Sequence, residues 1–593
     1  FETLGRVESE EQSDQDYKNL THFLNKNTVR YNDVLEPEKT TQILKIFEVW
    51  QYVGIHVPSN QMSKMILDVS IDWLLEISQK ERANDWGGIV NLKDFKFSLI
   101  NLILVSIQSN PTYTERYLNF LLLENEVSRE IYTHIVGASS VISQHHPQLL
   151  ADLTLKFLLD ELPKEYIERE EREQQRTHQY FQELLAKPKE ERTKEEQLKI
   201  DRRALFFHQA PYQQIQSHDW ENLSIKYESR HFYPSSPLKE PFFSLLNHSE
   251  ENGLQLIRDL SNHAIQAWKQ QCELSEQAPI PTTIEFPWGV QEFWGNEKQY
   301  IWKKPVWINN AISSAYMVLE NWCFEQLEQG RNFDELIQKI TLGHESVAIL
   351  CIVNVLALNK QIISNSIFPV VTNFKILELD NYRFKQDLQE PSTTLISFQG
   401  ESKYQKAINA VRHNSSREGH KLILESLLIN YFINHGFREL TKDKLSNLKT
   451  NLIFNFEHEK ADQSNIIFLE ERADYYAEYG NTENYSYQKI DENQFAYYFG
   501  HPQNKKQVES QEYKRLNEFA ICSRIAFWAE KSLEANAIQN NYTIDSIIEL
   551  IKELEEKDLF QDACDVHDGS STHKSMKQGA FSALATMILL AAV

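Results

Sequence analysis

The sequence predicts an all-α protein, an irregular HEAT/armadillo-like helical repeat array with a small β-hairpin insertion and loop-rich insertions. Glycine and proline number only 17 each among 593 residues, too few for a chain rich in tight β-turns. Apolar residues recur at helical spacing along most of the chain. The stretch from Pro305 to Lys360 shows this pattern most clearly, so we expect the rest of the chain to be organised around it.

The central stretch predicts three successive helices. The first, Val306–Gln329, carries an apolar stripe and ends before Gly330, a residue suited to a helix C-cap. The second, Phe333–Leu342, ends before Gly343. The third, Ser346–Leu358, is apolar on nearly every side and must be covered on all of them. It is shorter than the roughly 20 residues that cross a bilayer, so we expect the inner helix of a layered stack.

Composition and charge limit the classes of function. The length predicts two to four domains or one extended repeat array. The formal net charge of −24 argues against general nucleic-acid binding, because phosphate contact needs an excess of Lys and Arg. The five cysteines form no C-x-x-C motif, which argues against a zinc knuckle and a disulfide framework. Cys323 and Cys351 lie in apolar helical patterns and are expected to be buried thiols, which favours a cytoplasmic location.

Residues 1–163 predict N-terminal helical repeats that follow an acidic, polar segment. Helices of 12–20 residues with short joints are typical of stacked helical pairs, although no strict repeat period is visible. The proline at the start of the last helix suits a first helical turn. The expected helices are Thr41–Val53, Ser59–Gln79, Leu92–Ile107, Pro111–Leu123, Glu126–Ser140 and Pro147–Leu162.

Residues 164–203 predict a charged helical arm or spacer. Glu, Lys, Arg and Gln dominate, and opposite charges four residues apart support a solvated helix. Pro188 must break it, which gives two exposed helices. A solvated spacer is the simpler interpretation and a partner-binding arm is the functional one.

Residues 204–360 predict a central helical block, with an irregular aromatic segment before helices at Pro241–His248 and Gly253–Gln271. Residues 279–307 are rich in β-branched and aromatic side chains and predict a β-hairpin that turns at Gly295–Asn296 and packs on the helix Val306–Gln329. Its tryptophans either form a recognition surface or cover the helical stack. They are Trp288, Trp294, Trp302 and Trp307.

Residues 361–510 predict a mixed helical segment with a loop-rich insertion. We expect an extended piece at 367–379, a polar segment at 381–409, a helix over Glu418–His435 and a loop-dominated insertion at 468–500. Residues 511–593 predict C-terminal helices, among them Lys514–Glu534 and Ile544–Glu556.

The C-terminal region ends on an apolar run, GAFSALATMILLAAV, without a cap. Such a run needs a covering partner, because exposed Leu and Ile side chains would form an adhesive patch. We therefore expect the chain to be truncated and the native protein to continue beyond Val593 with at least one amphipathic helix.

No motif in the sequence predicts a catalytic, cofactor or metal site. One acidic and histidine-containing run, DACDVHDGSSTHKS, could hold a divalent ion, but its spacing matches no known metal loop and a polar loop is expected. Its candidate ligands are Asp562, Asp565, His567, Asp568 and His573. The GSSTHKS part lacks the spacing of a P-loop. His458 begins an H-E-x-x-H pattern whose second histidine is replaced by Asp462.

Three stretches carry a resemblance to a known family: PFFSLLNHSEENGLQLIRDLSNHA (241–264), EFWGNEKQYIWKKP with NNAISSAYMVLENW (292–322), and GHESVAILCIVNVLAL (343–358). They resemble the α-helical, HEAT-like region of large bacterial ATP-binding proteins of the signal-transducing (STAND/AAA-type) class, many of which serve in antiphage defence. In that family the nucleotide site lies in a separate NTPase module. The chain holds no Walker motif, so the resemblance implies the sensor or scaffold part and assigns no functional residue.

The sequence as a whole favours a non-enzymatic helical-repeat scaffold that binds a protein partner or another domain of the same polypeptide, without a cofactor. Curved helical stacks offer long concave surfaces for such contacts. Oligomer formation is compatible with this interpretation, and membrane association is not expected. The alternatives are a hydrolase whose site is assembled from the inserted segments 204–240 and 441–500, and an intracellular effector.

Overall fold

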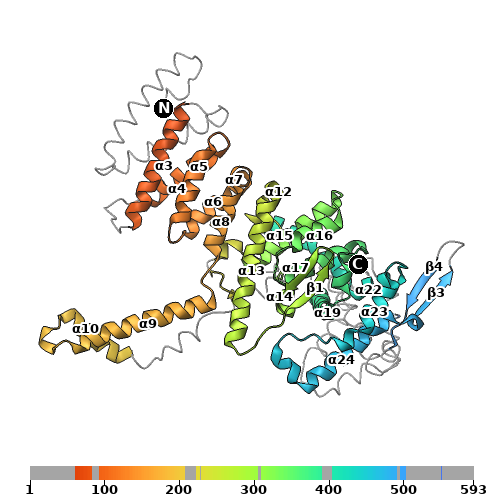
Figure 1. Ribbon diagram of the computed structural model, residues 1–593. Coiled ribbons are helices and arrows are strands. Elements are labelled where there is room, and N and C mark those ends of the chain that lie inside the picture. The colour runs from red at the N-terminus through yellow and green to blue at the C-terminus, as the bar shows by residue number, and fades with distance from the viewer. Residues whose placement is uncertain are drawn as a thin grey trace, which may run out of the picture. The chain divides into compact units, whose positions relative to one another are not determined.

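The computed structural model describes residues 61–82, 92–206, 222–226, 229–304, 309–389, 404–489, 495–502 and 549. Within these ranges the chain is mostly helical and contains two antiparallel sheets of two strands each (Figure 1). The prediction of a mainly helical chain with a small hairpin is therefore confirmed. The chain divides into two compact units, residues 1–473 and 474–593. Among the described helices, none combines the length and apolarity needed to cross a bilayer.

The first unit begins, within the described residues, with a series of amphipathic helices. They are α3 (Gln61–Arg82), α4 (Leu92–Val105), α5 (Pro111–Leu123), α6 (Arg129–Gly137), α7 (Ser139–His145) and α8 (Pro147–Leu158). Neighbouring members pack on one another, α3 on α4 and α5 on α8. The helix predicted at Glu126–Ser140 is two helices, because α6 ends at Gly137 and α7 starts after Ala138. The helix predicted at Thr41–Val53 lies outside the described residues.

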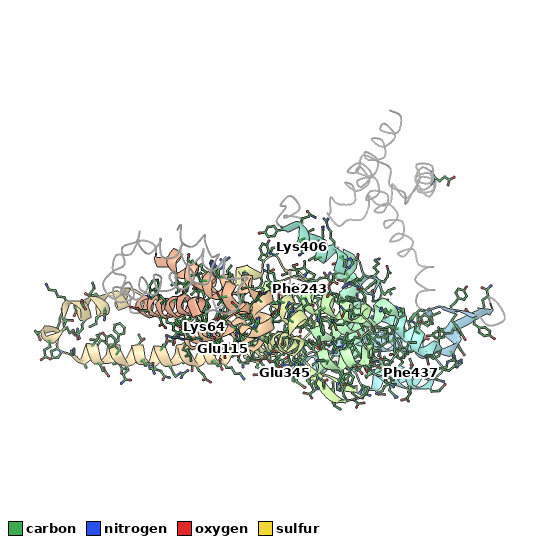
Figure 2. The ribbon with its side chains drawn as sticks, turned by 90° about the horizontal axis from the view of Figure 1, so that it is seen from above. Lys64, Glu115, Phe243, Glu345, Lys406 and Phe437 are labelled. Carbon is green, nitrogen blue, oxygen red and sulfur yellow. The ribbon has the colours of Figure 1, made fainter. Side chains whose placement is uncertain are left out.

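Residues 163–206 form an arm of two helices, α9 (Pro163–Ala186) and α10 (Lys194–Phe206), joined by a 3-10 turn at Lys189–Glu191. α9 ends at Ala186 and the backbone is extended at Lys187, the residue before Pro188, so the helix breaks at the proline as predicted. Thr193 and Glu196 cap α10 reciprocally, each side chain accepting from the other residue's N–H. α10 packs on α9, and most arm side chains are exposed (Figure 2).

The helices α12 (Phe242–His248) and α13 (Glu250–Leu274) lead into the hairpin of β1 (Thr282–Phe286) and β2 (Gly289–Phe293). The hairpin is confirmed, but its predicted turn at Gly295–Asn296 is wrong. The register pairs Phe286 with Gly289, so the turn lies at Pro287–Trp288. Gly289 takes a φ of +137°, which favours glycine.

Asn296 has a different role from the one predicted for it. Its side chain accepts a hydrogen bond from Lys298 N at 3.0 Å and caps α14 (Glu297–Tyr300). The second predicted arm, QYIWKKPVW, therefore begins in a helical turn rather than in a strand. Capping by Asn is a local alternative to a β-turn, and the two have similar sequence signals.

The core of the first unit contains α15 (Asn310–Glu328), α16 (Phe333–Thr341) and α17 (Ala348–Lys360). Every residue from Ala348 to Leu358 is buried, which confirms the prediction of an inner helix. Gly330 and Gly343 follow the first two helices with φ values of +90° and +78°, the left-handed region in which glycine has no steric cost.

Further helices complete the first unit: α18 (Phe368–Val371), α19 (Phe374–Gln389), α20 (Gln405–Ser415), α21 (Glu418–Lys421), α22 (Glu425–Ile433), α23 (Arg438–Ser446) and α24 (Gln463–Ala477), which ends in the second unit. The extended piece predicted at 367–379 is wrong. Asn373 accepts a hydrogen bond from Ile376 N at 3.2 Å and caps α19, whose apolar residues are buried at helical spacing.

The second unit contributes a hairpin of β3 (Tyr485–Lys489) and β4 (Phe495–Phe499). Tyr485 pairs with Phe499 in register, and the ring of Phe499 stacks on Tyr479 at a centroid distance of 4.6 Å. The prediction that residues 468–500 are mainly loop is wrong. The tyrosines that made this segment look irregular pair across the strands and pack on one another.

Candidate functional site

A cluster of ionisable side chains lies between the helices of the first unit, and we call it the charge cluster. Its members are Lys303, Lys304, Glu320, Asp380, Arg383, Asp387 and His420. Asp380 and Arg383 have no exposed side-chain surface. Buried charges destabilise a fold unless they are paired, so their contacts decide what the cluster does.

α19 supplies three of these side chains from one face. Asp380, Arg383 and Asp387 are separated by three and four residues, the spacing that places side chains one above another on a helix. The face is turned into the protein because the apolar residues of α19, among them Ile376 and Leu377, are buried as well. The helical period therefore brings two carboxylates to the two sides of one guanidinium.

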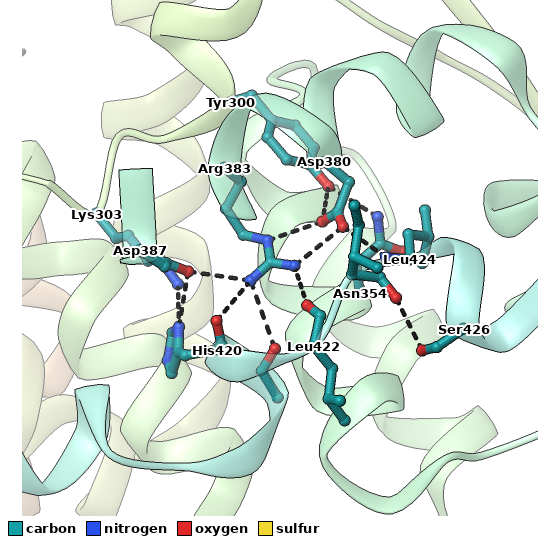
Figure 3. A network of polar contacts seen from close by, with 12 residues as sticks. Tyr300, Lys303, Asn354, Asp380, Arg383, Asp387, His420, Leu422, Leu424 and Ser426 are labelled. Carbon is teal, nitrogen blue, oxygen red and sulfur yellow. Dashed lines mark hydrogen bonds and ion pairs between the residues drawn. The ribbon is translucent and has the colours of Figure 1, made fainter. Parts of the chain in front are cut away.

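Arg383 is the centre of the network (Figure 3). Its guanidinium donates to both carboxylate oxygens of Asp380 at 2.9 Å and to Asp387 Oδ2 at 3.0 Å. It also donates to three backbone carbonyls between 2.6 and 3.4 Å away, those of Gly419, His420 and Leu422. Arg383 thus satisfies backbone carbonyls of α21 and of the connection from α21 to α22.

Asp380 extends the network to two more elements. It accepts from the Tyr300 hydroxyl at 3.2 Å and from Leu424 N at 3.0 Å. Tyr300 in turn accepts a hydrogen bond of 2.7 Å from Asn354, a buried residue of α17. The polar groups of α14, α17, α19 and the start of α22 therefore form one connected set.

His420 contacts the cluster through both ring nitrogens. Nε2 lies 2.6 Å from Glu320 Oε1, while Nδ1 lies 3.2 Å from Asp387 Oδ2 and 3.0 Å from Lys303 Nζ. Besides His420, the cluster holds three cations and three anions, so their charges balance.

Two carboxylates of the cluster, those of Glu320 and Asp387, stay ionised. Burial disfavours the charge on Glu320, but Lys303 and His420 outweigh it and hold the pKa of Glu320 at about 2. Burial acts in the same sense on Asp387, and Lys303, His420 and Arg383 hold the pKa of Asp387 well below its usual value. Both groups therefore contribute stability above their unfolded pKa values, and this stability is lost as the pH falls towards the folded ones.

A histidine beside carboxylates is a pairing that general bases use. Here the imidazole is 7% exposed, and cluster groups surround both of its nitrogens. The contacts of His420 therefore join three helices: α15 through Glu320, α19 through Asp387, and α21, which carries His420 itself.

Glu425, at the start of α22, is a buried carboxyl outside the charge cluster. Burial, with Asp380 nearby, raises its pKa from 4.5 to about 8. The folded state therefore keeps a proton that the unfolded chain releases as the pH rises from 4.5 to about 8. The protonated Glu425 side chain contributes its full stability below pH 4.5. As the pH rises towards about 8, this contribution to the free energy of unfolding is lost, by at most about 1.4 kcal/mol per pH unit.

We expect Glu425→Gln to remove this loss and to raise the free energy of unfolding near pH 8 by about 1–3 kcal/mol, because the amide carries no charge to bury. Thermal unfolding at acidic and alkaline pH measures the effect. Glu439→Gln, an exposed change on α23, should keep the wild-type pH dependence. An unchanged pH dependence in Glu425→Gln would refute the assignment.

Two of the tryptophans predicted as a recognition surface are partly exposed. The indole N–H of Trp288 donates to Gln291 at 3.1 Å. The ring of Trp294 lies 4.1 Å from the ammonium of Lys269, a cation–π contact. A role in recognition stays a prediction for these two residues.

The other two tryptophans differ from them. Trp302 is 1% exposed and packs edge-on against Tyr316 with ring centroids 6.1 Å apart, so it belongs to the core and not to a surface. Trp307 lies outside the described residues. Both follow the hairpin in a segment whose aromatic composition alone does not separate buried from exposed positions.

The metal and phosphate candidates of the sequence, residues 562–575, also lie outside the described residues, and the predicted absence of a metal site there stays a prediction. Within the part of the chain that the structure describes, no group of three or more His, Cys, Asp or Glu side chains could hold a metal ion. His458 is exposed in a 3-10 turn, Glu457–Ala461.

The charge cluster was missed because its members lie far apart in the chain. Lys303 and His420 are separated by 117 residues. The segment around Arg383 predicts only a polar region, although the pattern Asp380–Arg383–Asp387 on an apolar helix was a usable signal.

A search of protein-family models finds no match to the chain, and a search of curated proteins finds none either.

Proposed function

We propose that this chain is a helical scaffold or sensor region that acts through protein–protein contact, and that the arm of α9 and α10 makes that contact. One observation carries the proposal: the arm exposes apolar side chains at its end, on a stem that is wholly polar. Such side chains are stabilised when a partner covers them.

The stem is the part of α9 from Glu168 to Gln179, which contains no apolar residue. A helix of this length spans about 18 Å. Without an apolar face it has little reason to pack along the body, so it acts as a spacer.

The knob is the end of the arm, Tyr180–Ile200. Leu184 is buried there, but three large side chains stay open: Tyr180 at 41%, Leu185 at 55% and Leu198 at 50% exposure. Lys199 lies 5.7 Å from the centroid of the Tyr180 ring, so the open side chains have charged neighbours. A small apolar group within a polar rim is the arrangement of a protein-binding surface.

The base of the arm is fixed. Pro163 is buried, Lys164 N donates to Gln270 at 3.0 Å, and the Lys164 ammonium lies 2.6 Å from Glu273. Both acceptors are on α13, a long helix of the first unit. Because its base is fixed, the arm holds the knob in one place, which a loose tether would not do.

The wider proposal keeps the prediction of a HEAT-like array within a larger cytoplasmic bacterial protein, of the ATP-binding class that serves in antiphage defence. It rests on the resemblance of the three stretches 241–264, 292–322 and 343–358. The partner is then a protein or another domain of the same polypeptide.

The test is site-specific photo-crosslinking in cells that produce the protein, with p-benzoylphenylalanine placed at Leu198 or, as a control, at Leu440. Both positions are about half exposed, at 50% and 55%, and Leu440 lies on α23. We expect protein adducts at Leu198 and few at Leu440, and Leu185→Glu should remove the Leu198 adducts. Equal labelling at the two positions would overturn the proposal.

A further inference from the structure

The knob is a helical pair without an enclosed core. Two helices touch along one line, so each keeps an uncovered side. Here Leu184 is buried between them, while Phe181 and Ile200 are half-buried and Leu185 and Leu198 are open. Four helices, in contrast, surround a common core. A second helical pair of similar length would complete such a core.

We propose that the second pair is the knob of another copy of this chain, so that two arms associate as a four-helix bundle and the protein is a homodimer. The inference rests on the proposed function, because it names the partner of the same surface. A two-fold axis would place Leu185 and Leu198 of each copy between the helices of the other, as in isologous interfaces.

Charge favours a second copy at this place. The arm, residues 163–206, carries eleven lysines and arginines and eleven aspartates and glutamates, so it has no net charge. The whole chain carries −24. The rest of the chain outside the arm, which we call the acidic remainder, therefore carries all of this net charge. Two copies that approach through their acidic remainders repel each other, whereas two arms do not.

The interleaving of the signs also matters. In the knob, Lys187 lies 2.7 Å from Glu196, and in the stem Arg169 lies 3.3 Å from Glu173. A surface that mixes both signs at this spacing, with its charges already paired within the arm, does not repel its own copy, so the apolar side chains can hold the contact. A strongly basic partner would instead be drawn to the acidic remainder of the chain.

Sedimentation equilibrium of the purified full chain tests the inference. We expect a monomer–dimer equilibrium in the wild type and a monomer, with half the mass, in Leu185→Glu/Leu198→Glu. Leu123→Glu/Leu440→Glu, at positions 83% and 55% exposed outside the arm, should dimerise like the wild type. Circular dichroism shows whether each variant keeps its helix content, and only variants that do are compared.

Added salt gives a second readout. Screening weakens the repulsion between the two acidic remainders, so the dimer should tighten several-fold from low to moderate ionic strength. A dimer held by contacts between oppositely charged surfaces would weaken instead. Photo-crosslinking of the purified chain at Leu198 should join peptides of two knobs.

A wild type that stays monomeric at all concentrations, or a knob variant that dimerises as well as the wild type, overturns the inference. The proposed function is separable from it. If the pure chain is monomeric but Leu198 still forms specific adducts with a different protein in cells, the proposed function stands and the second copy is wrong. If Leu198 forms no specific adduct in either setting, both fail.

Discussion

Arg383→Met is expected to lower the free energy of unfolding of the first unit by about 3–5 kcal/mol, the usual effect of removing one partner from a buried ion pair. Asp380 and Asp387 would remain as buried carboxylates without the guanidinium that contacts both. The carbonyls of α21 and of its connection to α22 that Arg383 satisfies would lose a donor as well. Urea unfolding followed by the fluorescence of buried tryptophans such as Trp302 measures the change.

Two variants control this experiment. Arg116→Met removes an exposed ion pair with Asp72, whose side chains are 52% and 66% exposed, and should cost less than about 1 kcal/mol. Arg383→Met with Asp380→Asn should cost less than the sum of the two single changes, because neither partner is left charged alone. If Arg383→Met is as mild as Arg116→Met, the charge cluster does not hold the helices together.

Gly419→Ala is expected to destabilise the first unit by about 3 kcal/mol, a large effect for one methyl group. A Cβ at this position would lie 2.1 Å from the carbonyl oxygen of Val355, which is backbone of α17 and cannot rotate away. α21 would have to move from α17, and His420 would move away from Glu320 with it. Hydrogen exchange of the amides from Gly419 to Leu424 should therefore become faster.

Gly137→Ala is the matched control for that substitution. Gly137 also lies in a helix, at the end of α6, and its added Cβ would meet no atom within 4 Å. Alanine costs less conformational entropy than glycine, so this variant should be as stable as the wild type or more stable by up to about 1 kcal/mol. Equal stability of the two alanine variants would mean that the close contact of α21 with α17 is not required.

The sequence by itself determined the parts of the structure that depend on neighbours in the chain. The apolar period predicts α17 as an inner helix, Gly330 and Gly343 end the helices before it, and Pro188 divides the arm. These features follow from contacts within a few residues, which a sequence pattern records directly.

Only the tertiary structure decided where the hairpin turns, that α18 and the first part of α19 replace the extended piece, and that seven ionisable side chains meet in the interior. Asn296 could cap a helix or form a turn, and its neighbours favour neither. The pairing of Lys303, Glu320 and His420 joins segments far apart in the chain. The charges of Lys303 and Glu320 are stable in the interior only because the packed helices bring an opposite charge to each one, and no local pattern encodes that meeting.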